Sequence, residues 1–354
     1  MNRIHIIIIL AIAIMSGCDK HPDPNGGLAS GPYSYIFFDA GVVSTKGELI
    51  EGETLPSSTG TAFGVMGFRP DGSTPIFGMY GTADDQIQSA FDNVAKMYRP
   101  EKNAAFRYDK LATWHGGEHD FYAYYPFSDS GGADKAISNI GQSGNRPFVS
   151  YTQPAQLNIM TDVMTAYAPN QTASTSAVQL TFNHRLFAFD VVLKNNQSES
   201  LRDIIINDAV IQFYEIPESA TLYFDTPTVA DSPSGSQTIS HDFITSPVTI
   251  NHPTGNATSV TYIFNQGSSA TANSFLFLPC TALKLKFEIT YVNSWNEERT
   301  FTVDRSSTPL AVSEGFQAGH RYALVLNVSD EGQGFEFVPT IVNWENKNLD
   351  IKFN

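Results

Sequence analysis

Short runs of alternating apolar and polar residues recur along the chain, and this pattern constrains the fold more than any other feature. In residues 178–182 and 283–289, apolar side chains occupy every second position. Successive side chains of a strand point to opposite faces, so such a run predicts a half-buried strand. Strand-like runs separated by Gly, Pro, Ser, Thr and Asn cover residues 33–43, 62–68, 121–125, 177–193, 202–214, 259–264, 283–292 and 322–328. Many short strands with almost no long helical period favour an all-β protein built of β-sandwiches.

Two segments interrupt this pattern. Residues 84–98 place apolar side chains at helical spacing, yet Val94, Lys96 and Tyr98 also alternate, so we expect at most a short helix there. Residues 167–176 are small, polar and without apolar anchors, which is typical of a linker. We therefore place a domain boundary near Ser174, which divides the chain into an N-terminal domain, 33–173, and a C-terminal domain, 174–354.

The stretch from His115 to His119 has the form H-x-x-E-H, which is how one class of zinc protease motif is written. Such a site needs a helix, because the two histidines must lie on one helical face. Gly116 and Gly117 each cost about 1 kcal/mol in a helix interior, and the aromatic run that follows suits a strand. We therefore predict a turn with incidental histidines and no metal site.

The N-terminus has the features of an export signal. Arg3 precedes an apolar run over residues 4–15, which is too short to span a bilayer but has the length of a signal-peptide core. Small residues then precede Cys18, as in the lipobox of bacterial lipoproteins. We predict a signal peptide over residues 1–17, a lipidated (palmitoylated) Cys18 that anchors the chain to the outer membrane, and a flexible tether over residues 18–32. An unlipidated signal cleaved nearby is the alternative.

Composition and missing motifs reduce the number of possible functions. If Cys18 carries lipid, Cys280 is the one remaining thiol, and its apolar neighbours suit a small buried side chain rather than a nucleophile. The formal net charge of −15 argues against a nucleic acid as partner. Phosphate-binding loops, serine-hydrolase elbows and Cys-His pairs are missing from the sequence. We expect neither enzymatic activity nor a cofactor.

Five stretches, taken in order, give the chain a resemblance to a known family. They are the lipobox at Cys18, AFGVMGF at 62–68, the run from Trp114 to Pro126, the pair DVMTA at 162–166 with VQLTFNHRL at 178–186, and GHRYAL at 319–324 with the terminal VNW at 342–344. In this order they resemble the fimbrillin family, the FimA-like and Mfa-like lipoprotein pilins of type V pili. The resemblance implies two tandem transthyretin-like β-sandwich domains and a surface fimbrial subunit that takes part in cell adhesion.

Several side chains have a structural and a functional interpretation. His184 matches a histidine common in fimbrillin-like sequences, and we expect a structural role for it, because no second ligand or nucleophile lies at a recognisable spacing. Arg321 and Tyr322 are expected to be packing and edge residues. The three tryptophans are expected in the core or at edges, although a sugar-binding platform would need them exposed together. A monomeric, lipid-anchored protein that binds a glycan or a host protein is thus the alternative to a pilin.

The first mature strand is the predicted assembly element. Ile36, Phe38, Ala40 and Val42 alternate with Tyr35, Phe37 and Asp39, which gives one apolar face able to fill a sandwich groove. Lys46 follows at the place where related pilins usually carry an arginine for a maturation protease, so Lys46 is the predicted cleavage site.

Removal of that strand would open a groove to a strand of another subunit. The predicted donor is the C-terminal tail, where Leu349, Ile351 and Phe353 alternate with charged residues. Because this tail is short, the chain could also accept a strand without donating one, as a tip subunit does; a stalk or anchor role stays open.

Overall fold

A computed structural model describes residues 35–42, 55, 61–77, 93–102, 105–128, 136–143, 146–195, 203–226, 231–255, 257–265, 274–292, 296–330 and 335–343. Within these residues the regular secondary structure consists of strands and one short 3-10 helix, η1 (Leu157–Ile159). The predicted all-β class is confirmed. In the described part, no helix has the length and apolar character needed to cross a membrane. The predicted signal peptide and tether lie outside the described residues.

A six-stranded sheet, in the order β1-β8-β7-β4-β2-β3, forms the N-terminal end of the molecule. Its strands are β1 (Phe38–Val42), β2 (Ala62–Phe68), β3 (Val94–Tyr98), β4 (His119–Tyr125), β7 (Met164–Gln171) and β8 (Val178–His184). The alternation predicted for residues 178–182 is confirmed, because Val178, Leu180 and Phe182 are buried. These three side chains meet residues of β1, β2, β4 and β7 in one apolar core, so the sheet curls around its own interior.

A four-stranded sheet, in the order β12-β11-β6-β5, packs against the outside of the first sheet. Its strands are β5 (Ile137–Ser143), β6 (Arg146–Thr152), β11 (Ser219–Tyr223) and β12 (Asp231–Ser234). A second core joins the two sheets, with Tyr122 and Tyr124 of β4 on one side and Val149, Tyr151 and Leu222 on the other. The outward face of β4 is therefore as buried as its inward face, which explains its nearly continuous apolar sequence.

Two further sheets form the C-terminal sandwich. One contains β10 (Ile204–Ile216), β13 (Gln237–Asp242), β14 (Val248–Ile250), β17 (Cys280–Val292), β18 (Glu298–Asp304) and β19 (Leu310–Phe316). The other contains β9 (Phe187–Asn195), β15 (Val260–Ile263), β16 (Phe275–Phe277), β20 (Arg321–Asp330) and β21 (Phe335–Asn343). Their inner faces share the largest apolar core, in which Phe213 and Phe287 face Phe189 and Leu324.

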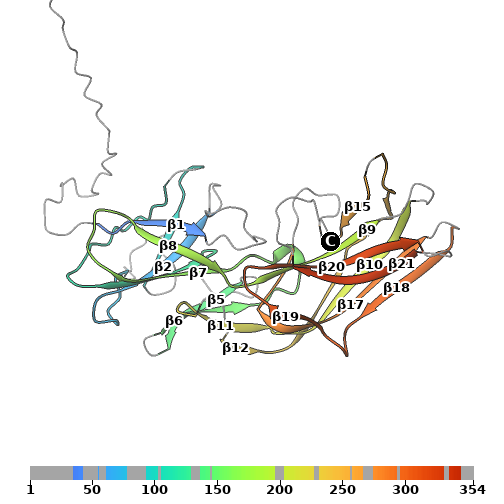
Figure 1. The fold of residues 1–354 in the computed structure, drawn as a ribbon. Helices are drawn as coiled ribbons and strands as arrows, with labels where there is room; N and C mark the ends of the chain where they lie inside the picture. Colours follow the sequence, from blue (N-terminus) through green and yellow to red (C-terminus); the bar gives the residue numbers. More distant parts are fainter. Residues whose placement is uncertain are drawn as a thin grey trace, which may run out of the picture.

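The described strands form an elongated body, with β1, β2, β7 and β8 at one end and β9, β10, β17, β18, β20 and β21 at the other (Figure 1). Strand pairing does not divide the chain at Ser174. β8 follows that position, yet it pairs with β1 and β7, and β11 pairs with β6 from the earlier half. The chain passes from the N-terminal sheets to the C-terminal sandwich between His184 and Phe187, although β11 and β12 later return to the sheet of β5 and β6. The outer limits 33–173 and 174–354 stay predictions.

Part of each of the two segments that interrupt the predicted strand pattern is a strand. Residues 94–98 form β3, which pairs antiparallel with β2, so the alternating pattern and not the helical one describes this part; residues 81–92 lie outside the described residues. Tyr167, at the start of the predicted linker, lies within β7 and pairs with Tyr122 of β4. The linker is thus shorter than predicted, because β7 continues to Gln171.

Candidate functional site

β1 is an edge strand whose partner is far away in the sequence. It runs parallel to β8, in a register from Phe38 opposite Val178 to Val42 opposite Phe182. On its other side, the backbone N–H of Ile36 donates to the carbonyl of Ala112 at 2.9 Å. This second contact is confined to the beginning of the segment, so the backbone of β1 is held mainly along one edge.

The inner face of β1 fills the N-terminal core. Ile36, Phe38 and Ala40 are 0%, 5% and 5% exposed, as their alternation predicts. The Phe38 ring lies 5.1 Å from Phe121, 6.1 Å from Tyr108 and 6.2 Å from Phe77, measured between ring centroids. Val42 ends the strand, and its side chain lies outside the described residues. Removal of β1 would therefore leave an aromatic-lined cavity and not a flat surface.

One buried tyrosine forms hydrogen bonds with the segment that precedes β1. The Tyr108 hydroxyl donates to the carbonyl of Ile36 at 2.7 Å and accepts from the backbone N–H of Ala112 at 3.1 Å. Burial raises the pKa of Tyr108 well above its ordinary value, so the phenol stays protonated and can donate. This arrangement fixes the segment before β1 without any charged group.

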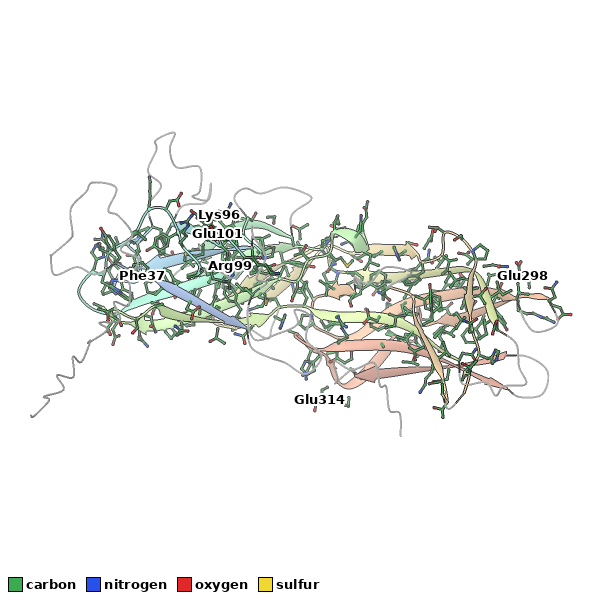
Figure 2. The ribbon with its side chains drawn as sticks, turned by 90° about the horizontal axis from the view of Figure 1, so that it is seen from above. Phe37, Lys96, Arg99, Glu101, Glu298 and Glu314 are labelled. Atoms are coloured by element: carbon green, nitrogen blue, oxygen red, sulfur yellow. The ribbon has the colours of Figure 1, made fainter. Side chains whose placement is uncertain are left out.

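The outer face of β1 is exposed. Phe37 is 44% exposed, the largest value among the exposed large apolar side chains of the described residues. Figure 2 shows Phe37 beside β1, far from Glu298 and Glu314 of the C-terminal sandwich. The segment thus has one face in the core and one in solvent, as is usual for an edge strand.

The remaining predicted assembly residues lie outside the described residues: Cys18, Lys46, Leu349, Ile351 and Phe353. The described chain ends at Asn343 in β21, an edge strand that pairs with β20. Among the described strands, none pairs with the other edge of β21. The structure therefore describes the residues that β1 packs against and the last described strand before the tail.

The H-x-x-E-H stretch is a turn, as predicted. Gly117 has φ of +96°, a conformation that favours glycine, and His119 is the first residue of β4. In the described residues, no group of three metal-ligating side chains comes together. His119 is nevertheless not incidental: it is buried, its ring meets Trp114 edge-on at 5.3 Å, and burial lowers its pKa. Trp114 is buried, as expected; Trp295 and Trp344 lie outside the described residues.

His184 has the structural role that the sequence analysis predicts, but its partner, Asp162, was not predicted. Its Nδ1 lies 2.7 Å from an Asp162 carboxylate oxygen, and both residues are buried. Tyr322 packs in the C-terminal core, and Arg321 lies 3.7 Å from the buried Asp190. Cys280 is half-buried beside that core, and burial raises the pKa of its thiol to about 11. None of these residues has the surroundings of a reactive group.

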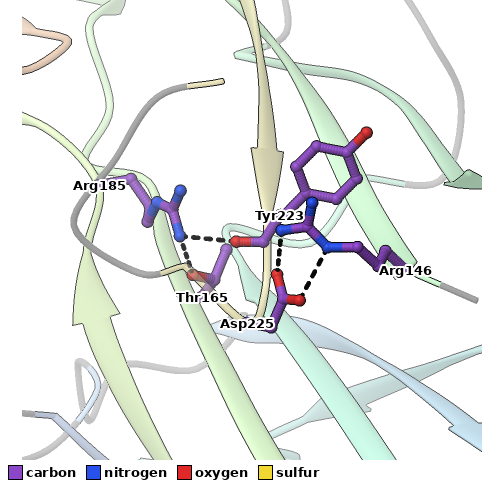
Figure 3. A network of polar contacts seen from close by, with 5 residues as sticks. All are labelled: Arg146, Thr165, Arg185, Tyr223 and Asp225. Atoms are coloured by element: carbon purple, nitrogen blue, oxygen red, sulfur yellow. Dashed lines mark hydrogen bonds and ion pairs between the residues drawn. The ribbon is translucent and has the colours of Figure 1, made fainter. Parts of the chain in front are cut away.

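Sequence reasoning missed a polar network between β7 and β11 (Figure 3). The buried Arg185 donates to the Thr165 hydroxyl at 3.2 Å and to the Tyr223 carbonyl at 2.9 Å. Next to it, Arg146 donates to both carboxylate oxygens of Asp225, at 2.8 and 2.7 Å. The sequence pattern indicates this network only weakly, because its residues come from four separate strands or strand ends and share no motif.

The fold and the edge strand define an all-β protein of several packed sheets, whose first described strand is held by a long-range parallel pairing. The chain belongs to the fimbrillin-like family, whose model matches residues 59–344. No curated protein sequence matches it.

Three solved structures illustrate the similarity. A fimbrial protein from Bacteroides vulgatus ATCC 8482 is 16% identical, with a TM-score of 0.54 over 88% of this chain and 100% of its own. A candidate cell adhesion protein from Bacteroides uniformis ATCC 8492 is 17% identical, with a TM-score of 0.46 over 88% and 98%. The fimbrial anchor protein Mfa2 from Porphyromonas gingivalis is 12% identical, with a TM-score of 0.36 over 88% and 98%. At such identities the first of these shows the fold alone.

Proposed function

We propose that the protein is a subunit of a cell-surface pilus and assembles by exchange of its first strand. The observation that carries this is β1: its apolar face fills the core through Ile36, Phe38 and Ala40, while its backbone is held mainly along one edge. Membership of the fimbrillin-like family supports the same function. A lipid on Cys18 carries the precursor to the outer membrane, and the assembled subunit contributes to cell adhesion.

Assembly begins with a cut after Lys46, which separates the first strand from the rest of the chain. The aromatic residues around Phe38 then line an open groove, and their exposure to water favours any strand that refills it. The C-terminal tail of another subunit, with Leu349, Ile351 and Phe353 on one face, supplies that strand. Such a head-to-tail contact does not close on itself, so it propagates into a filament.

The test uses the full-length chain and a protease that cleaves after lysine. We expect the cut protein to bind a synthetic peptide of residues 348–354 or to form heat-resistant multimers. Lys46→Ala is the matched control, because it removes the cleavage site and should keep the chain monomeric under the same digestion. The proposal is wrong if the cut protein neither binds the peptide nor multimerises, and if the cell-surface form still begins at Cys18.

A second measurement tests the anchor. Cys18→Ala should stop incorporation of radiolabelled palmitate and release the protein from the outer-membrane fraction. Palmitate that still appears on the variant would contradict lipidation at Cys18. The competing function, a monomeric glycan- or host-binding protein on the same lipid anchor, predicts that the chain remains a monomer after cleavage.

A further inference from the structure

A stacked pair of tyrosines marks the surface where β4 and β7 meet. Tyr122 and Tyr167 are directly opposite in the strand pairing, and their rings are parallel within 7° at a centroid distance of 4.7 Å. Tyr122 is 7% exposed and is backed by Phe68 and Phe224, whose rings meet it edge-on. Tyr167 is 37% exposed. The outer ring is therefore fixed by a buried one and offers aromatic surface to solvent.

Charged groups lie beside this ring. Phe224, which contacts Tyr122, is followed by Asp225, and Asp225 forms the two-bonded ion pair with Arg146. Both side chains of the pair are nearly half-exposed. The Arg146 guanidinium also lies 4.0 Å from the centre of the Tyr223 ring. The ion pair thus lies beside a further aromatic ring, that of Tyr223 (Figure 3).

A second carboxylate, that of Asp120 at the start of β4, borders the same surface. Its Oδ1 accepts a hydrogen bond from the backbone N–H of Asn170, three residues after Tyr167, at 2.9 Å. Burial raises the pKa of Tyr167, and the nearby carboxylates of Asp120 and Asp225 raise it further. The outer ring therefore lies within electrostatic range of two acidic groups that come from different sheets.

The two halves of this surface are fixed relative to each other. The buried Arg185 bonds Thr165, two residues before Tyr167, and the carbonyl of Tyr223, two residues before Asp225. The aromatic ring and the charged rim are thus joined through one buried guanidinium rather than through a loop. A surface with such preorganised groups loses little conformational entropy when it binds a ligand.

We propose that the surface formed by Tyr167, Tyr122, Tyr223, Arg146, Asp120 and Asp225 binds a neutral pyranose of a glycan. A pyranose has an apolar face of C–H groups, which packs on an exposed aromatic ring, and hydroxyl groups, which pair with carboxylates and a guanidinium. Two carboxylates against one exposed guanidinium disfavour a sialylated or sulfated sugar. This proposal rests on the surface-adhesion function proposed above, but it does not depend on strand exchange.

The test measures binding of the uncut, full-length chain to immobilised neutral hexose oligosaccharides, with sialylated and sulfated counterparts as the anionic arm. We expect binding to the neutral arm, a loss of about tenfold or more in affinity for Tyr167→Ala, and near-normal affinity for Tyr167→Phe, which keeps the ring. Asp225→Asn should weaken binding without removing the aromatic surface. Phe37→Ala, which removes an exposed aromatic side chain just before β1, is the control and should bind like the wild type.

A stacked tyrosine pair also stabilises a sheet, so each variant's urea midpoint is measured alongside binding. Loss of affinity in Asp225→Asn at an unchanged midpoint supports a binding role. Wild-type protein that binds no neutral glycan, binds the anionic arm better, or keeps its affinity in Tyr167→Ala overturns the proposal. A chain that assembles after cleavage yet binds no glycan would refute this inference alone, whereas one that binds but never assembles would refute strand exchange.

Discussion

Replacement of Phe38 by alanine tests whether β1 fills the N-terminal core. A buried phenylalanine removes about 150–250 Å² from water. At roughly 25 cal/mol per Å², this area corresponds to at most about 4–6 kcal/mol. Phe38 is 5% exposed and touches three aromatic rings, so nearly all of its side chain counts. Core Phe→Ala changes cost about 3–5 kcal/mol, and we expect about 3–4 here, because an edge strand can shift partly into the cavity.

The assay is urea unfolding of the full-length protein followed by tryptophan fluorescence, since Trp114 lies in the same core. Phe37→Ala is the matched control: the same side chain is removed one position away, where it is 44% exposed, and the change should stay within about 0.5 kcal/mol. The same Phe38 variant should take up the 348–354 peptide without prior cleavage, because its own strand competes less well. Equal effects of the two substitutions on stability would refute the packing of β1 described above.

Three further predictions concern the histidines of the turn and Cys280, the one thiol in the described part of the chain. Burial lowers the pKa of His119 below its usual 6.5, so the folded chain binds fewer protons than the unfolded chain. Stability should therefore be lost as pH falls below about 6.5, and urea midpoints of His119→Gln should lack this part of the decline. Metal analysis should find no stoichiometric zinc in the wild type or in the variant with both His115→Ala and His119→Ala. The double variant should nevertheless lose roughly 1–3 kcal/mol of unfolding free energy, because His119 is buried. With its pKa near 11, Cys280 should react with iodoacetamide at pH 8 far more slowly in native than in urea-unfolded protein; equal rates would contradict its burial.

Local pattern was enough to predict individual strands. Leu283, Leu285, Phe287 and Ile289 alternate in sequence, and all four are buried in β17. The same logic identified the inner face of β1. Alternation involves only residues close together in the sequence, so it can be recognised without knowing the partner strand.

Pairing was not predictable in the same way. Nothing near Phe38 specifies that its neighbour is β8, and nothing near Leu222 specifies that β11 joins β6 across the predicted boundary. Tyr167 was assigned to a linker, because the small polar residues that follow it in β7 have the composition of a loop. Asp162, the partner of His184, was missed because 22 residues separate the two and only the fold brings them together.

The parallel pairing of β1 with β8 also affects the order in which the chain can fold. Phe38 and Val178 are 178 − 38 = 140 positions apart, which makes their contact expensive in chain entropy, about 4 kcal/mol for closing a loop of that length. Hairpins such as β5 with β6 close over a few residues and can form first. β1 therefore cannot enter its sheet until residues 178–182 of β8 have been synthesised, long after β1 itself.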